Sequence, residues 1–204
     1  KDGEDGVAQS YFEYLKIPYT HSGVISSYNS MNKIISKKIF IKNKILTPEY
    51  FILKKELLKD EILKYKLKKN KIFFPIVLKP INEGSSLGVK IVNNFQNLKK
   101  SAKLLLEKYD QLIIEKYIGG QEIQVAVIKN TALGAIELIP KRKFYDYRAK
   151  YTKSAKTQHL MPANLKKKKY FKVLKLAEKA HRILECKGVT RSDFKFFNDK
   201  FYLL

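Results

Sequence analysis

Hydrophobic residues follow two spacings along this chain. Segments in which they recur every three or four positions predict helices with one buried face, and these are residues 7–15, 31–43, 55–64, 94–109 and 166–185. Segments in which they are continuous, or alternate with polar residues, predict strands, and these are residues 50–53, 73–80, 89–92, 112–114, 122–128, 132–139, 192–197 and 201–204. Because helices and antiparallel strands are mixed along the chain, we expect α+β packing.

Some of the helical segments give more specific expectations. Ser30 is the predicted N-cap of the second helix, because serine is a favoured capping residue. Met31, Ile35 and Ile39 then lie one turn apart. The helix of residues 94–109 is expected to bury Leu98, Ala102, Leu105 and Tyr109. The helix of residues 166–185 is expected to bury Phe171, Leu174, Ala177 and Leu184.

The chain has 204 residues, enough for one large domain or two small ones with a real core. No stretch approaches the roughly 20 apolar residues of a membrane helix, and the polar first six residues lack a signal-peptide pattern. Cys186 is the single cysteine, so no internal disulfide forms and we expect a cytoplasmic location. The chain begins without methionine and ends on an apolar run, Phe201 to Leu204, so we expect a fragment of a longer protein.

The formal net charge of +23 raises the alternative of a nucleic-acid-binding protein. Lysine supplies most of the cations, and the lysines are scattered over every segment. The two dense runs, residues 64–69 and 166–169, fall where a loop or helix start is expected, which favours solvated surface. A nucleic-acid binder would show salt-sensitive binding of RNA or DNA and no effect of ATP.

The strongest local signal is Lys79 at the end of an apolar strand, followed by a loop of residues 82–88 that contains two glycines and two serines. Glycine lets the backbone fold sharply and turn consecutive N–H groups toward an anion. Ser85 and Ser86 add hydroxyl donors. In a Walker loop the lysine follows the glycines, whereas here it precedes them, so the loop would lie over phosphates as a flap. A plain Gly-Ser hairpin turn explains this segment equally well.

Three further segments combine residues that suit a binding site. The strand of residues 112–114 runs into the polar stretch 115–122, and its backbone groups can meet the edge of a purine. Residues 144–151 hold three tyrosines, two cations and an acid. Arg191 and Asp193 stand at the start of a strand, where a guanidinium can hold an oxyanion and a carboxylate can bind Mg²⁺. Taken alone, each has an ordinary structural explanation as a turn, an amphipathic surface loop or a surface ion pair.

The order and spacing of these four segments resemble the ATP-grasp superfamily, and within it the D-alanine–D-alanine ligase family. The motifs that carry the resemblance are Lys79-Pro80 with Glu83-Gly84-Ser85-Ser86-Leu87-Gly88, Glu115-Lys116 with Glu122, the tyrosine-rich loop, and Arg191-x-Asp193. Supporting pieces are Gly3-Glu4-Asp5-Gly6, Ile17-Pro18-Tyr19-Thr20, Ser30-Met31-Asn32-Lys33 and Cys186-Lys187-Gly188. The resemblance covers essentially the whole chain.

The resemblance implies a nucleotide site. Lys33 and Lys79 correspond to the pair that binds the α- and β-phosphates of ATP. Glu115, Lys116 and Ile118 resemble residues beside the adenine, and Glu122 resembles the acid that binds the ribose. Lys150 is placed to reach the γ-phosphate, and Ser85 and Ser86 belong to the flap.

The resemblance also implies roles in the reaction. Ser85 resembles the serine that links the flap to the first substrate, and Tyr151 the tyrosine that closes its loop over the site. Arg191 resembles the residue that stabilises an acyl phosphate and the tetrahedral state. Asp193 resembles a ligand of Mg²⁺, with Mn²⁺ as an alternative ion.

The implied architecture is an ATP-grasp fold of two α+β subdomains that grip ATP, with a remnant of an N-terminal α/β domain. The corresponding boundaries are residues 1–30, 31–118 and 119–204. The implied reaction joins two D-alanine molecules through an acyl phosphate, for peptidoglycan synthesis, in a homodimer. Family segments that complete the metal and substrate sites are absent from this sequence, so we expect the 204 residues alone to be inactive.

Three other functions compete with this assignment. Another ATP-grasp ligase, joining a different acid to an amine, needs the same nucleotide residues but does not predict Tyr145, Tyr147, Lys150 and Tyr151 together. The other two are a noncatalytic ATP-binding fragment and the nucleic-acid binder. The ligase assignment requires that Lys33, Lys79, Lys150 and Arg191 meet beneath the flap.

Overall fold

The computed structural model describes residues 3–140 and 157–204 and divides the chain into two compact units. One unit comprises Pro48–Ile118, and the other comprises Lys1–Thr47 together with Gly119–Leu204. We call these the central unit and the terminal unit. Residues 31–47 fall in the terminal unit because Phe40 and Ile45 belong to its buried cluster. The three-part division suggested by the sequence assigns these residues to the central part instead, and it stays a prediction.

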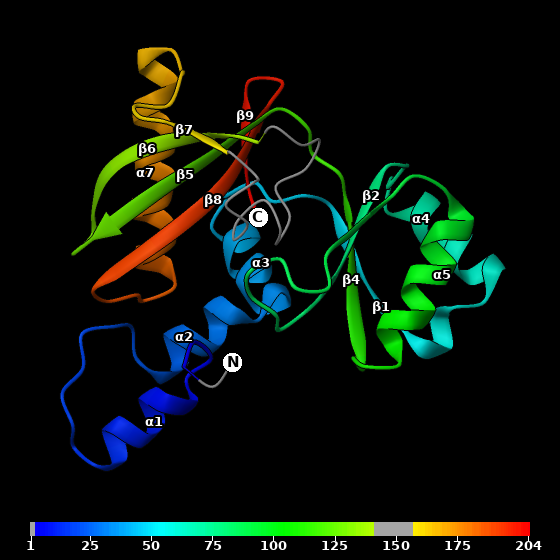
Figure 1. Cartoon of the computed structure of the whole chain (residues 1–204), viewed down its shortest axis with the longest axis horizontal. Coiled ribbons are helices and arrows are strands. Elements are labelled where there is room, and N and C mark those ends of the chain that lie inside the picture. The colour runs from blue at the N-terminus through cyan, green and yellow to red at the C-terminus, as the bar shows by residue number, and fades with distance from the viewer. Residues whose placement is uncertain (1–2, 141–156) are drawn as a thin grey trace. The chain divides into compact units, whose positions relative to one another are not determined.

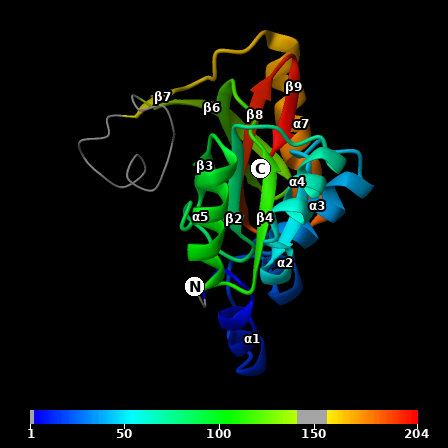
Figure 2. The same ribbon diagram turned by 90° about the vertical axis from the view of Figure 1, so that its right-hand side faces the viewer.

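The central unit is a four-stranded antiparallel sheet with two helices on one face (Figures 1 and 2). The strand order is β1-β4-β2-β3. The elements are β1 (Tyr50–Lys54), a 3-10 turn η1 (Lys55–Leu57), α4 (Asp60–Lys69), β2 (Ile76–Pro80), β3 (Lys90–Val92), α5 (Phe95–Leu106) and β4 (Gln111–Lys116). Leucines of both helices pack against alternate strand residues such as Leu53, Leu78 and Leu112. One face of this sheet is therefore committed to the core.

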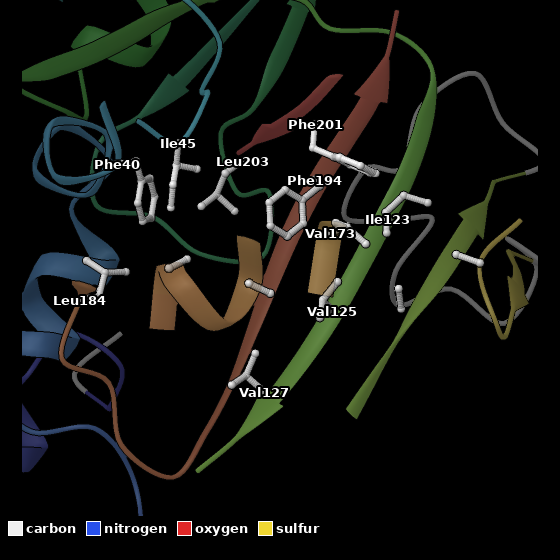
Figure 3. Close-up of a cluster of buried hydrophobic side chains, with 14 residues drawn as sticks. Phe40, Ile45, Ile123, Val125, Val127, Val173, Leu184, Phe194, Phe201 and Leu203 are labelled. Atoms are coloured by element: carbon white, nitrogen blue, oxygen red, sulfur yellow. The ribbon is translucent and has the colours of Figure 1, made fainter. Parts of the chain in front are cut away.

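The terminal unit contains a five-stranded antiparallel sheet in the order β7-β6-β5-β8-β9. Its strands are β5 (Gln121–Ile128), β6 (Thr131–Ile139), β7 (Gln158–Leu160), β8 (Val189–Phe197) and β9 (Lys200–Leu203), and its helices are α1 (Val7–Tyr14), α2 (Val24–Met31), α3 (Lys33–Lys42) and α7 (Lys167–Ile183). The long helix α7 packs along one face of the sheet (Figure 1). Figure 3 shows Val173 of α7 among Ile123, Val125 and Phe194, with Phe40 of α3 in the same cluster.

The structure corrects several local predictions. The N-cap of α3 is Asn32 rather than Ser30, because the Asn32 Oδ1 accepts hydrogen bonds from the backbone N–H groups of Ile34 and Ile35, each at 3.1 Å. Ser30 instead lies inside α2, a helix that the sequence pattern did not predict. Phe171, expected to be buried, is 54% exposed, and Val173 takes the core position.

The basic run of residues 64–69 lies in the second half of α4, not in a loop or at a helix start. This helix begins with Asp60 and Glu61 and ends with Lys66, Lys68 and Lys69. Acidic residues in the first turn and basic residues in the last turn complement the helix dipole. The helix predicted at residues 55–64 is found instead at Asp60–Lys69, about five residues further along the chain. The second run, residues 166–169, does lie at a helix start, that of α7.

Across the described ranges 3–140 and 157–204, no helix has both the length and the apolar character needed to cross a membrane.

Candidate functional site

Lys79 and Glu115 form a buried ion pair in the central unit. The Lys79 Nζ lies 2.9 Å from the Glu115 Oε2, and the two side chains are only 10% and 2% exposed. Lys79 is on β2 and Glu115 on β4, two strands that pair directly. Their neighbours Leu78 and Ile114 face the helices, and side chains alternate along a strand. Lys79 and Glu115 therefore lie on the face of the sheet that the helices leave uncovered.

Glu115 also influences its neighbour on β1. Tyr50 lies directly opposite Glu115 in the β1–β4 pairing. Burial of the phenol, and then the negative charge of Glu115, raise the pKa of Tyr50 above its usual value of 10.0. This hydroxyl consequently stays protonated over the physiological range, and it adds a neutral polar group beside the ion pair.

The glycine–serine loop has an unusual backbone. Ser85, Ser86 and Gly88 have φ angles of 50°, 61° and 71°, in the left-handed region that serine rarely adopts. The Leu87 N–H donates to the Gly84 carbonyl at 2.9 Å, and the Val89 N–H donates to the Ser86 carbonyl at 3.2 Å. A Cβ at position 88 would stand 2.7 Å from the Pro80 Cγ. From the sequence, we expected the glycines to provide the sharp bend of the backbone. In the structure, Ser85 and Ser86 also adopt left-handed φ angles and contribute to the bend.

Three predicted site residues of the terminal unit share one face of the five-stranded sheet. Glu122 on β5 alternates with Ile123, and Arg191 and Asp193 on β8 alternate with Phe194. Because Ile123 and Phe194 belong to the core beneath α7, the three charged residues point to the opposite face. In the β5–β8 pairing, Glu122 is opposite Lys195, Gln124 is opposite Asp193 and Ala126 is opposite Arg191. We call the charged residues of this ladder, with Gln124, the polar face.

Within the polar face, Arg191 binds Asp193 with two hydrogen bonds. The Arg191 Nε donates to the Asp193 Oδ1 at 2.8 Å, and a terminal guanidinium nitrogen donates to the Oδ2 at 3.1 Å. The two side chains are 57% and 27% exposed. A planar guanidinium that meets a carboxylate in this geometry can meet the oxygens of an acyl phosphate in the same way.

Asp193 by itself supplies only part of a metal site. Residues 3–140 and 157–204 contain no group of three acidic, histidine or cysteine side chains able to hold a metal ion. Mg²⁺ is bound through one or two protein carboxylates, with water and substrate oxygens as further ligands. A single carboxylate is compatible with one ligand position, and the predicted metal role of Asp193 stays a prediction.

The remaining predicted residues are more dispersed. Lys33 is the first residue of α3, directly after the Asn32 cap. Ile118 is buried, and Lys116 lies 3.5 Å from the Glu49 carboxylate in an exposed pair. Lys150, Tyr151 and the rest of the tyrosine-rich loop lie outside the described residues. The convergence of Lys33, Lys79, Lys150 and Arg191 therefore stays a prediction.

Sequence reasoning missed two members of the polar face, Gln124 and Lys195. Gln124 is buried beside Asp193, and the Lys195 Nζ lies 2.9 Å from the Glu122 Oε2. The alternation that predicts the strands also carried this signal, since a polar residue two positions from Glu122 or Asp193 must share its face. That Glu122 and Lys195 lie next to each other, by contrast, depends on how β5 and β8 pair, and these strands are distant in sequence.

Comparison with known proteins identifies the family. A sequence model described as the D-ala D-ala ligase C-terminus matches residues 39–204. The chain belongs to the D-alanine–D-alanine ligase family. It is 57% identical over 202 residues to a D-alanine–D-alanine ligase of Pelagibacter ubique. The alignment covers 99% of this chain and 65% of that relative.

Solved structures agree with the D-alanine–D-alanine ligase assignment. The ligase from Bacillus anthracis, complexed with ATP, is 30% identical with a TM-score of 0.81, and the match covers 100% of this chain and 63% of that one. The VanG D-Ala:D-Ser ligase from Enterococcus faecalis is 26% identical with a TM-score of 0.86, covering 100% and 59%. The predicted α+β class and ATP-grasp fold are thereby confirmed. The chain spans somewhat less than two thirds of the length of these family members.

Proposed function

We propose that the protein containing this chain is an ATP-dependent ligase that joins two D-alanine molecules for peptidoglycan synthesis. ATP phosphorylates the carboxylate of the first D-alanine to give an acyl phosphate and ADP. The amine of the second D-alanine then attacks the acyl carbon, and inorganic phosphate leaves as the amide forms. The observation that carries the proposal is the family match over residues 39–204, together with 57% identity over 202 residues to a ligase of this name.

The geometry of the polar face supports this chemistry. Phosphoryl transfer requires positioning and charge neutralisation more than a nucleophilic side chain. Arg191 is exposed enough to reach a substrate and has the fork that matches a phosphate or an acyl phosphate. In the proposed reaction its guanidinium stabilises the negative oxygens of the acyl phosphate and of the tetrahedral state. Asp193 orients Arg191 when no substrate is bound.

The proposed nucleotide contacts are those that the resemblance to the family implies. Lys33 and Lys79 neutralise the α- and β-phosphates, and Lys150 neutralises the γ-phosphate. Glu115 holds the Lys79 ammonium in place through their 2.9 Å pair. Glu115, Lys116 and Ile118 lie beside the adenine, and Glu122 accepts hydrogen bonds from the ribose hydroxyls.

The flap and the closing loop bind the first substrate. Ser85 and Ser86 provide hydroxyl donors on a backbone held in the left-handed region, and Tyr151 closes over the site. Mg²⁺, or Mn²⁺, would be held in part by Asp193 and would neutralise phosphate charge. The use of ATP is consistent with a cytoplasmic location, and the resemblance carries the expectation of a homodimer.

A phosphate-release assay tests the proposal. The complete polypeptide containing this chain is mixed with ATP, Mg²⁺ and D-alanine, with L-alanine as the control. We expect phosphate release that depends on D-alanine and a dipeptide product detectable by mass spectrometry. No release above the L-alanine control would refute the proposal.

Adding a second amino acid to the assay distinguishes this function from that of a ligase that joins D-alanine to a different amine. The similarity to the VanG D-Ala:D-Ser ligase from Enterococcus faecalis favours one alternative, in which the amine comes from another D-amino acid. The same assay with D-alanine and D-serine together shows which mixed or symmetric dipeptide forms. Salt-sensitive RNA binding without any response to ATP would support the nucleic-acid alternative instead.

A further inference from the structure

Lys195 and Glu122 form a second ion pair that the sequence analysis did not connect. The two residues are direct partners across the β5–β8 pairing, 73 positions apart in the chain. The Lys195 Nζ donates to the Glu122 Oε2 at 2.9 Å, and the side chains are 14% and 11% exposed. Both belong to the polar face, because their neighbours Ile123 and Phe194 face the core beneath α7.

An ion pair at this position is not explained by stability alone. Removing two charges from water costs free energy that their mutual attraction only partly offsets. A pair of apolar side chains would fill the same space in a sheet at least as favourably. A lysine that is largely buried next to a carboxylate instead fixes the position of that carboxylate.

We infer that Lys195 is a positioning residue that orients the Glu122 carboxylate toward the ribose hydroxyls of the nucleotide. The inference rests on the proposed function, in which Glu122 is the ribose-binding acid. The ammonium of Lys195 donates to the Glu122 Oε2 and holds that oxygen in place. A carboxylate has about four acceptor positions on two oxygens, so the Glu122 carboxylate can accept a ribose O–H while it accepts from Lys195. Lys195 thereby sets the preference for a ribonucleotide over a deoxyribonucleotide.

A purely structural pair makes a different prediction. If Lys195 only stabilises the sheet, replacing it lowers the melting temperature and leaves the relative affinity for ATP and 2′-deoxyATP or 3′-deoxyATP unchanged. If it positions Glu122, the replacement reduces that relative affinity even in protein that is fully folded.

The experiment measures the Kd of ATP, 2′-deoxyATP and 3′-deoxyATP by calorimetry, using the complete polypeptide containing this chain. We expect the unsubstituted protein to bind ATP about tenfold more tightly than at least one deoxy analogue, the effect of one charge-assisted hydrogen bond. Lys195→Met and Glu122→Gln should each reduce this ratio to about twofold or less, and Lys195→Arg should retain it.

Lys175→Met is the matched control, because Lys175 pairs with Glu178 at 2.8 Å on α7, away from the polar face. It should leave the ratio unchanged. A Lys195→Met protein with the original ratio overturns the inference, as does an unsubstituted protein that binds ATP and both analogues equally. Should Lys195→Met fail to fold, a loss of the ratio in Lys195→Arg would overturn it as well. Binding is measured apart from phosphate release, so a protein that selects ATP but does not join D-alanine contradicts only the proposed function.

Discussion

The sheets of the two units are built in the same way, but Lys79–Glu115 in the central unit and Arg191–Asp193 in the terminal unit differ in their exposure to solvent. In each unit, one face of an antiparallel sheet packs against helices and the other carries the charged residues of the candidate site. In the central unit the pair Lys79–Glu115 is almost fully buried. In the terminal unit the pair Arg191–Asp193 remains open to solvent.

This difference separates two kinds of contribution. A buried pair is coupled strongly to folding, because the loss of one partner leaves an uncompensated charge in a region of low dielectric constant. An exposed pair contributes little to stability, but its members remain accessible to a ligand. We therefore expect substitutions in the buried pair Lys79–Glu115 to act through stability and those in the exposed pair Arg191–Asp193 to act through turnover.

The largest expected effect tests the buried pair. Glu115→Leu leaves Lys79 without its carboxylate and should lower the free energy of unfolding by about 3–5 kcal/mol. The double variant Lys79→Met with Glu115→Leu should recover most of that loss, because both charges of the pair are then removed. Urea unfolding followed by fluorescence measures both. A single variant within about 1 kcal/mol of the unsubstituted protein would contradict the distinction between the buried and the exposed pair.

The next effect tests the exposed pair. Arg191→Ala removes the guanidinium proposed to stabilise the acyl phosphate, and it should lower kcat by roughly 10²–10³-fold. Its melting temperature should change little, since the side chain is 57% exposed. Arg182→Ala on the outer surface of α7 serves as the control for loss of one positive charge. If Arg191→Ala keeps the original kcat, the role of the polar face in turnover is wrong.

A third prediction concerns the loop of the central unit. Gly88→Ala places a Cβ 2.7 Å from the Pro80 Cγ at a φ of 71°, and it should lower the free energy of unfolding by about 1–3 kcal/mol. Gly3→Ala is the control, because a Cβ there meets nothing within 4 Å. Equal stabilities of the two variants in thermal unfolding would show that the loop adopts another backbone conformation.

The smallest effect is a pH dependence in the terminal unit. Burial, and then the charge of Arg182, lower the pKa of His181 below its ordinary value of 6.5. The unfolded chain therefore takes up the proton first as pH falls. The stability associated with neutral His181 is present above pH 6.5 and is lost as pH falls from there toward the lower folded-state pKa. His181→Gln should reduce the slope of stability against pH in that window, and an unchanged slope would contradict the assignment.

The sequence predicted strand positions better than helix boundaries. Alternation of Ile123, Val125 and Val127 predicted β5 with its buried face, and all three are fully buried. Helix ends depend on single capping groups, and the predictions of Ser30 as an N-cap and of a helix at residues 55–64 were wrong: the N-cap is Asn32 and the helix is Asp60–Lys69. Ser30 and Asn32 are both good capping residues, and only the hydrogen bonds to Ile34 and Ile35 distinguish them.

The sequence by itself determined the family and the chemical types of the candidate residues, because the order of the lysine, glycine–serine and Arg-x-Asp motifs is a property of the chain. It also determined which residues of a strand share a face, since side chains alternate with a period of two. Only the tertiary structure brought Lys79 to Glu115 and Glu122 to Lys195. These pairs join strands distant in sequence, and their register is set by packing between strands rather than by the pattern within either one.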